Sequence, residues 1–425
     1  MADLSYVRTE MVPQQAPPIT ETGAIKWARE NLFSGVANSI LTLLALYFLY
    51  QVLHEVIPWL FFSTWNANSL AECREIAEGG CWAVIRERWP QLVFGFYPSE
   101  YYWRPILTFV LMLVALAPVL FNGLPRRMVW FSALFPFLAF WLLWGGSLWL
   151  PVAVIAGFAL AAVSVIYLPA LTGTLLATIV AFIAPVLWWL FLAAPMASSL
   201  QSILPLAIEP IESAKFGGFM LSVTIGITGI SLSLPIGILL ALGRQSNLIA
   251  VKAICVGFIE FIRGVPLITL LFVASTLLNY FLPPGTTFDI ILRVMIMVTL
   301  FSSAYMAEVI RGGLSALPKG QYEAADALGL DYWKSMRLII MPQALKITIP
   351  SIVSLFIGLF KDTTLVSIIG LLDPIGLSNA IRADQDWNGI VWELYGFIAL
   401  MFWLFCFSMS RYSMYLERKL QTGHR

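Results

Sequence analysis

Long apolar runs are the feature that most limits how this chain can fold. The first extends from Val36 to Phe62, and similar runs recur up to the C-terminal tail. A helix of about 20 apolar residues crosses the roughly 30 Å of hydrocarbon in a bilayer, where every backbone polar group must be paired. With 60% hydrophobic and 12% charged residues, the sequence predicts an all-α polytopic membrane protein. The net charge of +1 gives no reason to expect a nucleic-acid partner.

Ten membrane spans are expected, five in each half of the chain. Two pairs of runs meet at very short turns, 145–147 and 169–170, so eight spans are the alternative if one of these pairs is re-entrant. The expected spans are Val36–Phe62, Pro105–Phe121, Met128–Trp144, Leu148–Leu168, Leu171–Ala194, Phe216–Leu242, Val251–Phe281, Ile290–Ile310, Leu345–Leu371 and Ile390–Met409.

The distribution of lysine and arginine predicts the orientation of the spans. Short loops rich in these residues stay in the cytoplasm. The connections that contain Arg126, Arg244 and Lys319 all fall on one side of the ten-span topology. Both termini are then cytoplasmic, and the long loop 63–104 is periplasmic.

Four cysteines and two histidines do not make a metal site by their spacing. Cys255 and Cys406 lie inside apolar runs. Cys73 and Cys81 lie eight residues apart in the loop predicted to be periplasmic, where a disulfide can form. Free thiols at these two positions are the alternative.

The stretch from Glu308 to Pro342 is the longest in the C-terminal half without an apolar run. It predicts two short helices that are bent at Gly329, because glycine readily takes the positive φ that ends a helix. Asp331 is the expected N-cap of the second helix. That helix would place Trp333, Met336 and Ile340 on one face, and Pro342 would mark the entry to the next apolar run.

The same stretch resembles the EAA loop of bacterial ABC-importer permeases. The resemblance depends on Glu323–Ala325, Gly329 and Met341–Ala344, and the flanking segments 258–267 and 304–313 are similar to the polar amino-acid branch of that family. In the family this loop is a coupling helix that sits in a groove of the ATPase subunit. The resemblance therefore implies a set of ATPase-coupling residues, namely Glu323, Ala324, Ala325, Gly329, Trp333 and Pro342.

The resemblance also implies a domain organisation and a set of partners. It covers about residues 216–418, which would be a five-helix type I importer core with its coupling loop at 308–342. Residues 36–215 would be an N-terminal extension of about five spans, as in general L-amino-acid permeases, between cytoplasmic tails at 1–35 and 419–425. The expected partners in a Gram-negative inner membrane are a second similar permease, an ATPase dimer, a periplasmic binding protein and an L-amino acid. The sequence lacks the pattern GxxxxGK[ST], so ATP with Mg²⁺ is expected on the separate ATPase, with no cofactor or enzymatic activity in this chain.

Charged residues inside predicted spans are candidates for substrate binding, because such charges require a partner or a wet cavity. Glu260 and Arg263 are one helical turn apart, just before Pro266, which is expected to break its helix. A second cluster, Lys361–Thr364, lies in the fourth core span. Counted along their helices, both clusters are predicted at middle to outer depth, where they could line one cavity.

An amino-acid zwitterion needs a cation for its carboxylate and an acceptor for its ammonium group, and the two clusters contain both. The candidate substrate residues are Glu260, Arg263, Lys361, Asp362, Thr363 and Thr364. One alternative is structural, with Glu260 paired to Arg263 and Lys361 to Asp362. The other is an ion-coupled secondary amino-acid transporter, with Glu260 and Asp362 as its coupling carboxylates.

Overall fold

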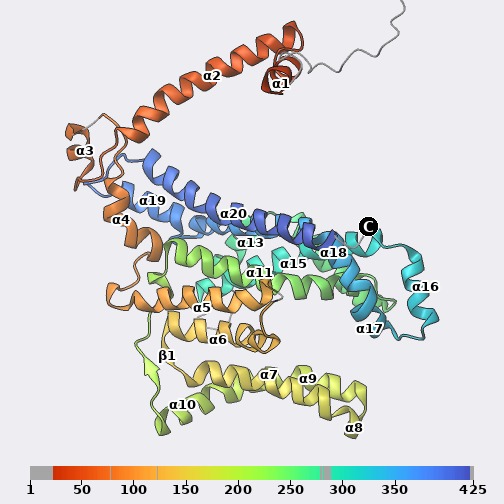
Figure 1. Ribbon diagram of the computed structural model, residues 1–425. Helices are drawn as coiled ribbons and strands as arrows, with labels where there is room; N and C mark the ends of the chain where they lie inside the picture. The colour runs from red at the N-terminus through yellow and green to blue at the C-terminus, as the bar shows by residue number, and fades with distance from the viewer. Residues whose placement is uncertain (1–22, 77, 122, 278–279, 281–288, 422–425) are drawn as a thin grey trace, which may run out of the picture. The chain divides into compact units, whose positions relative to one another are not determined.

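A computed structural model describes residues 23–421, apart from 77, 122, 278–279 and 281–288. The described chain is built of helices (Figure 1) and divides into two compact units at the junction of Ala83 and Val84. Among the described residues, nine helices are long and apolar enough to cross a membrane. There are ten if the two helices at 249–264 and 267–277, which meet at a sharp angle, count together as one span. The predicted all-α polytopic fold is confirmed.

The first unit contains three helices, α1 (Gly23–Asn31), α2 (Val36–Phe61) and α3 (Leu70–Ile76). Helix α2 has no buried residue, as expected for a span that faces lipid on all sides. After α2 the chain folds back, and the Gly80 amide donates a hydrogen bond of 2.8 Å to the Trp59 carbonyl. A disulfide joins Cys73 to Cys81, whose Cα atoms lie 5.7 Å apart.

The second unit begins with helices that precede the predicted core. They are α4 (Ala83–Phe94), α5 (Trp103–Leu120), α6 (Val129–Trp144), α7 (Trp149–Tyr167), α8 (Pro169–Thr172), α9 (Thr174–Leu187), the π-helical turn η4 (Trp188–Leu192) and α10 (Ala193–Ile203). The predicted turn at 169–170 is wrong, because Pro169 begins α8 and the chain reverses at Gly173, with φ of 83°. Two short antiparallel strands, β1 (Gly146–Ser147) and β2 (Ala207–Ile208), join the start of the α7–α10 hairpin to its end.

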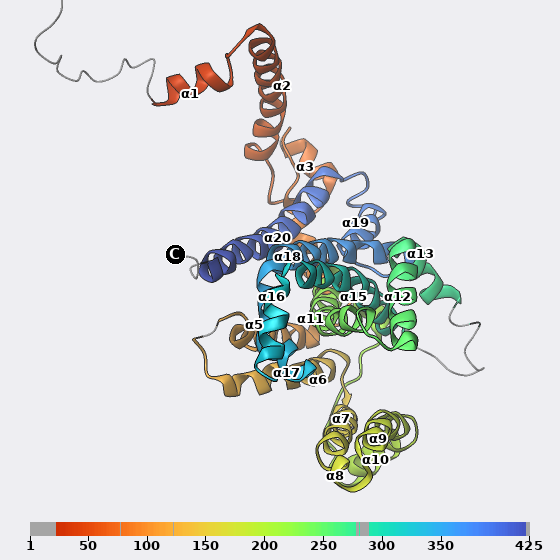
Figure 2. The same ribbon diagram turned by 90° about the vertical axis from the view of Figure 1, so that its right-hand side faces the viewer.

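The remaining helices form a bundle around α15. They are α11 (Gly218–Arg244), α12 (Ile249–Gly264), α13 (Leu267–Phe272), the π-helical turn η6 (Val273–Leu277), α15 (Ile290–Ala316), α16 (Lys319–Ala327), α17 (Tyr332–Ser335), the π-helical turn η7 (Met336–Ile340), α18 (Met341–Asp362), the 3₁₀ segment η8 (Thr363–Ile369), α19 (Pro374–Arg382) and α20 (Trp392–Gln421). Helices α16 and α17 lie at one end of this bundle and α19 at the other (Figure 1). Figure 2 views the bundle from the α16–α17 end.

Close approach between α11 and α15 depends on glycine. A Cβ atom at Gly237 would overlap Met306, and one at Gly229 would press on Val298 and Leu359. Small residues at such contacts let two membrane helices pack backbone to backbone. The span after α11 is broken as predicted, since α12 and α13 meet at an angle of 102° beside Pro266.

At the α19 end, three segments meet at contacts where only glycine fits. Gly95 follows α4 and bridges to Phe216, while Gly217 bridges to Leu372. A Cβ atom at Gly218, which has a φ of 61°, would overlap the carbonyl oxygen of Leu92. The end of α4 is therefore held against the start of α11, which ties the extension to the bundle.

We expect Gly218→Ala to destabilise the second unit, because alanine meets both an unfavourable φ and a backbone carbonyl. The positive φ alone costs about 1–3 kcal/mol. The melting temperature of the purified protein in detergent checks this, with Gly257→Ala as the control, since a Cβ atom at Gly257 meets nothing within 4 Å. Equal melting temperatures for the two variants would contradict the proposed contact.

Candidate functional site

The polar connection between α15 and α18 forms a pair of short helices joined by a bend. Gly329 makes the bend with φ of 65° and no atom within 4 Å of a would-be Cβ, so only its backbone conformation favours glycine. Asp331 caps α17 by accepting a hydrogen bond of 2.9 Å from the Lys334 amide. The hydrogen bonds from the Lys334 backbone and side chain hold the pKa of Asp331 below its usual range.

The bent pair has one face toward the core and another toward solvent. Ala325 is fully buried, so of the predicted coupling residues it cannot meet a partner directly. Glu323 and Ala324 are exposed. Leu328 and Trp333 are 72% and 67% exposed, so large apolar side chains lie on the solvent face of a polar element. Such a patch is typical of an interaction surface.

The second short helix is not separate from the next span, contrary to the prediction. Helix α17 continues through η7 into α18 as one helical run from Tyr332 to Ile369, and Pro342 lies in the first turn of α18, at the entry to the span as predicted. A π-helical turn just before Pro342 rearranges the local hydrogen bonds, which lets a residue without an amide proton follow. The predicted common face of Trp333, Met336 and Ile340 is also wrong, because Met336 and Ile340 are buried in the core cluster whereas Trp333 is 67% exposed.

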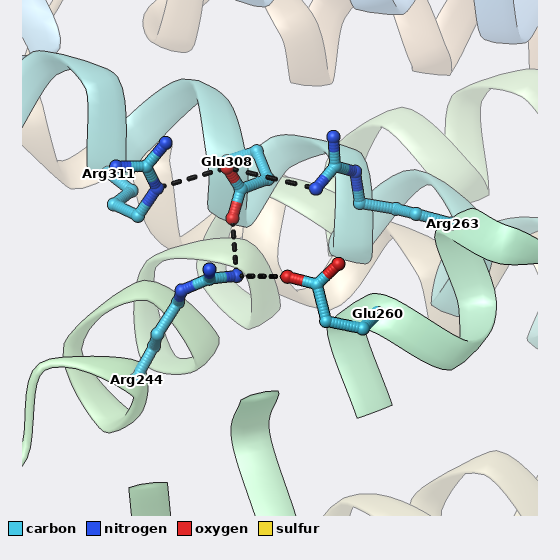
Figure 3. Close-up of polar contacts among 5 residues, drawn as sticks. All are labelled: Arg244, Glu260, Arg263, Glu308 and Arg311. Atoms are coloured by element: carbon cyan, nitrogen blue, oxygen red, sulfur yellow. Dashed lines mark hydrogen bonds and ion pairs between the residues drawn. The ribbon is translucent and has the colours of Figure 1, made fainter. Parts of the chain in front are cut away.

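Five charged side chains from α11, α12 and α15 form one network near the bent pair of α16 and α17 (Figure 3). Glu308 lies at its centre, with 16% of its side chain exposed. Its carboxylate is 2.6 Å from Arg244, 3.0 Å from Arg311 and 3.8 Å from Arg263. Arg244 also reaches Glu260 at 2.9 Å, so one guanidinium joins carboxylates from two helices.

The network differs from the structural alternative, which paired Glu260 with Arg263. Glu260 pairs with Arg244, and Arg263 faces Glu308 and the Tyr305 ring, whose centroid lies 5.6 Å from the guanidinium carbon. Spacing along one helix allowed that pair, but helix packing brings Glu260 and Arg263 partners from other helices. With three arginines and two glutamates the network has one positive charge in excess. Within the described part of the chain, the buried Nε of Arg263 meets no hydrogen-bond partner.

Sequence reasoning did not identify Arg244, Glu308 and Arg311 as site residues. Glu308 and Arg311 lie within the segment 304–313 that carried the resemblance, and their i, i+3 spacing in an apolar context was the available signal. Arg244 looked like an ordinary loop residue at the end of a span. Only the packing of α11 against α12 reveals its role.

The second predicted cluster lies where α18 changes into η8. Thr363 is fully buried and packs near Gly226 of α11. The Thr363 hydroxyl donates to the Phe360 carbonyl at 2.7 Å and the Thr364 hydroxyl to the Lys361 carbonyl at 2.8 Å. Lys361 is exposed, and Asp362 is partly buried.

The two clusters do not line one cavity at a common depth, contrary to the prediction. Gly226 of α11 faces Thr363, whereas Gly237 faces Met306 and Ala307, directly before Glu308. Eleven residues separate the two glycines, or about 16 Å along the helix. The predicted depth of Arg263 was too great. Helix α12 is short, and Arg263 near its C-terminus still contacts Glu308, toward the α16–α17 end of the bundle.

We expect Glu308→Gln to destabilise the bundle by about 1–3 kcal/mol, because it leaves three clustered guanidinium groups without their shared carboxylate. Partial exposure of the network keeps the cost below that of a fully buried pair. Thermal unfolding in detergent measures it, and Glu260→Gln is the matched control with a 54% exposed side chain. An unchanged melting temperature for Glu308→Gln, or an equal loss for both variants, would remove Glu308 from the centre of the network.

Comparison with known proteins agrees with this architecture. A profile of the family described as "Binding-protein-dependent transport system inner membrane component" matches residues 233–422. Over 434 residues that cover 100% of both chains, the protein is 59% identical to "Glutamate/glutamine/aspartate/asparagine transport system permease protein BztC" of Rhodobacter capsulatus. It is 39% identical, over 94% of each chain, to "Inner membrane amino-acid ABC transporter permease protein YhdY" of Escherichia coli K12.

A shorter relative aligns over nearly its whole length with about half of this chain. "Glutamate/aspartate import permease protein GltK" of Escherichia coli O6:H1 is 29% identical over 50% of this chain and 96% of its own length. The two longer relatives align across the extension as well as the part that the family profile matches. On this evidence, together with its apolar helices, the protein belongs to the permeases of amino-acid ABC importers, which are multi-pass proteins of the inner membrane.

Proposed function

We propose that this chain forms the translocation path of an ATP-driven importer of L-amino acids and couples it to a separate ATPase. Its partners are a second similar permease, an ATPase dimer that binds ATP with Mg²⁺, and a periplasmic binding protein. Both termini and the α16–α17 end lie in the cytoplasm. The name of the relative that is 59% identical supports glutamate, aspartate and their amides as the substrate class.

A polar face of α18 supports the proposed path most directly. Ser351, Ser354 and Lys361 are exposed, and a Cβ atom at Gly358 would meet nothing within 4 Å. These residues recur at intervals of three and four, so they form one stripe along the helix. Serine and lysine within a membrane span face a water-filled cavity or another protein chain rather than lipid.

The exposed face of α20 makes a useful contrast with this stripe. Its exposed side chains include Leu400, Trp403, Leu404 and Phe407, which suit lipid. The exposed face of α20 also includes Ser408, so it is Lys361, which has no charged counterpart between Leu400 and Phe407 of α20, that supports a wet environment along α18. At its α19 end the stripe reaches Lys361, beside Asp362 and Thr364, where an amino-acid zwitterion would meet a cation and acceptors.

Family membership disfavours the ion-coupled alternative, since the full-length relatives are named as permeases of transport systems and of an ABC transporter. In the proposed importer this chain performs no chemistry of its own. Movement of α16 and α17 by the ATPase would be passed to α18 through the continuous helical run from Tyr332 to Ile369.

We expect Lys361→Gln to lower amino-acid uptake by at least about tenfold, because it removes the cation that meets the substrate carboxylate. The melting temperature should stay unchanged, as Lys361 is exposed and no ion pair of it occurs among the described residues. Uptake into vesicles that contain the whole complex provides the measurement. Lys346→Gln, at an exposed lysine of the same helix, is the control. Normal uptake by Lys361→Gln would exclude Lys361 from the path.

We expect Gly329→Val to abolish ATP-driven uptake while the membrane helices keep their melting temperature. A β-branched residue resists positive φ at a cost of about 1–3 kcal/mol, which would reshape the bend without touching the core. Gly320→Ala in α16 is the control, since its Cβ atom meets nothing within 4 Å. Wild-type uptake by Gly329→Val, with the ATPase still bound, would refute the coupling role of the bend.

A further inference from the structure

A cavity of about 360 Å³ lies between the bent helical pair and the end of α11. It opens to solvent at the α16–α17 end of the bundle. The cavity is lined on three sides. Gln245, the C-cap of α11, lines the first, α16 lines the second, and α17 with η7 lines the third. The lining residues are Gln245, Tyr322, Asp326, Tyr332, Ser335 and Met336.

The lining has the chemistry of a receptor for a cation. Asp326 supplies a carboxylate, and Tyr322 and Tyr332 supply two aromatic rings. Carboxylates and aromatic faces together attract guanidinium and ammonium groups. Gln245 and Ser335 add a side-chain amide and a hydroxyl, which can accept hydrogen bonds from the same groups.

The carboxylate of Asp326 is available for this purpose, whereas that of its neighbour is not. No ion pair of Asp326 occurs among the described residues, and its side chain is exposed on α16. Asp331, five residues later, already caps α17 and lies 3.0 Å from the Lys334 ammonium group. Glu323 is also exposed on α16 but does not line the cavity, so Asp326 is the carboxylate of the bent pair that faces it.

We propose that this cavity is the socket for one basic side chain, arginine or lysine, of the ATPase subunit. The inference rests on the proposed function, in which the bent pair docks on the ATPase, and it adds the chemistry of the contact. The exposed Leu328 and Trp333 would supply apolar contact area beside the socket. The ion pair in the cavity would fix how the bent pair lies on the ATPase surface, since one basic side chain can enter the cavity in only one arrangement of the two proteins.

The affinity of the purified ATPase subunit for the permease complex tests the socket. We expect Asp326→Asn to weaken binding by about ten- to a hundredfold at about 50 mM salt, because a charge-assisted hydrogen bond is lost. The wild-type protein should lose affinity as salt rises to about 500 mM, and the variant should lose much less. Asp331→Asn is the matched control, since asparagine still caps a helix, and it should bind within about twofold of wild type.

Two further variants separate failure of the socket from failure of docking. Asp326→Glu keeps the charge and should recover most of the affinity that Asp326→Asn loses. If Asp326→Asn binds as wild type does while Gly329→Val loses binding, the bent pair docks but the cavity is no socket. If neither variant changes binding, docking through the bent pair is refuted, and the socket with it. A loss for Asp326→Asn that Asp326→Glu does not recover would also overturn the ion pair.

Discussion

The carboxylate of Glu308 is the contact on which the arrangement of the bundle depends. Charged groups at membrane depth are tolerated only where they compensate one another. Glu308 meets three arginines from α11, α12 and α15, and Arg244 extends the network to Glu260. The requirement for mutual compensation therefore fixes where three helices meet. Because α15 ends eight residues after Glu308 and leads into α16, the same contact positions the bent pair beneath it.

Local signals in the sequence predicted much of the fold. Apolar runs located the spans, Pro266 located a break, and Gly329 and Asp331 located a bend and a cap. Each of these features depends on residues within one or two turns of each other. The helices α8 to α10 at the end of the extension were predicted less well. The chain turns at Gly173 and not at Pro169, and α10 continues through polar residues up to Ile203.

The candidate site was harder to predict, because its contacts join distant parts of the chain. The partner of Glu260 is sixteen residues away and that of Arg244 sixty-four, and neither separation leaves a periodic signal. The depth of Arg263 depends on how α12 packs, which counting residues along a span does not reveal. Lys361 to Thr364 lie inside the predicted span Leu345–Leu371, at the point where α18 changes into η8.

The Lys361–Thr364 cluster and the bent pair lie on one helical run. Thr363 packs against α11 just beyond the far end of α18, and the helical run that contains α18 begins at Tyr332 in the bent pair. A helix transmits a displacement along its axis more faithfully than a loop, since its hydrogen bonds resist extension. The π-helical turn at η7 is the point where this run is least regular, and such turns are common at functional positions. In the proposed importer, a movement of α17 would therefore bend this run most easily at η7, which lies between the bent pair and the stripe that ends at Lys361.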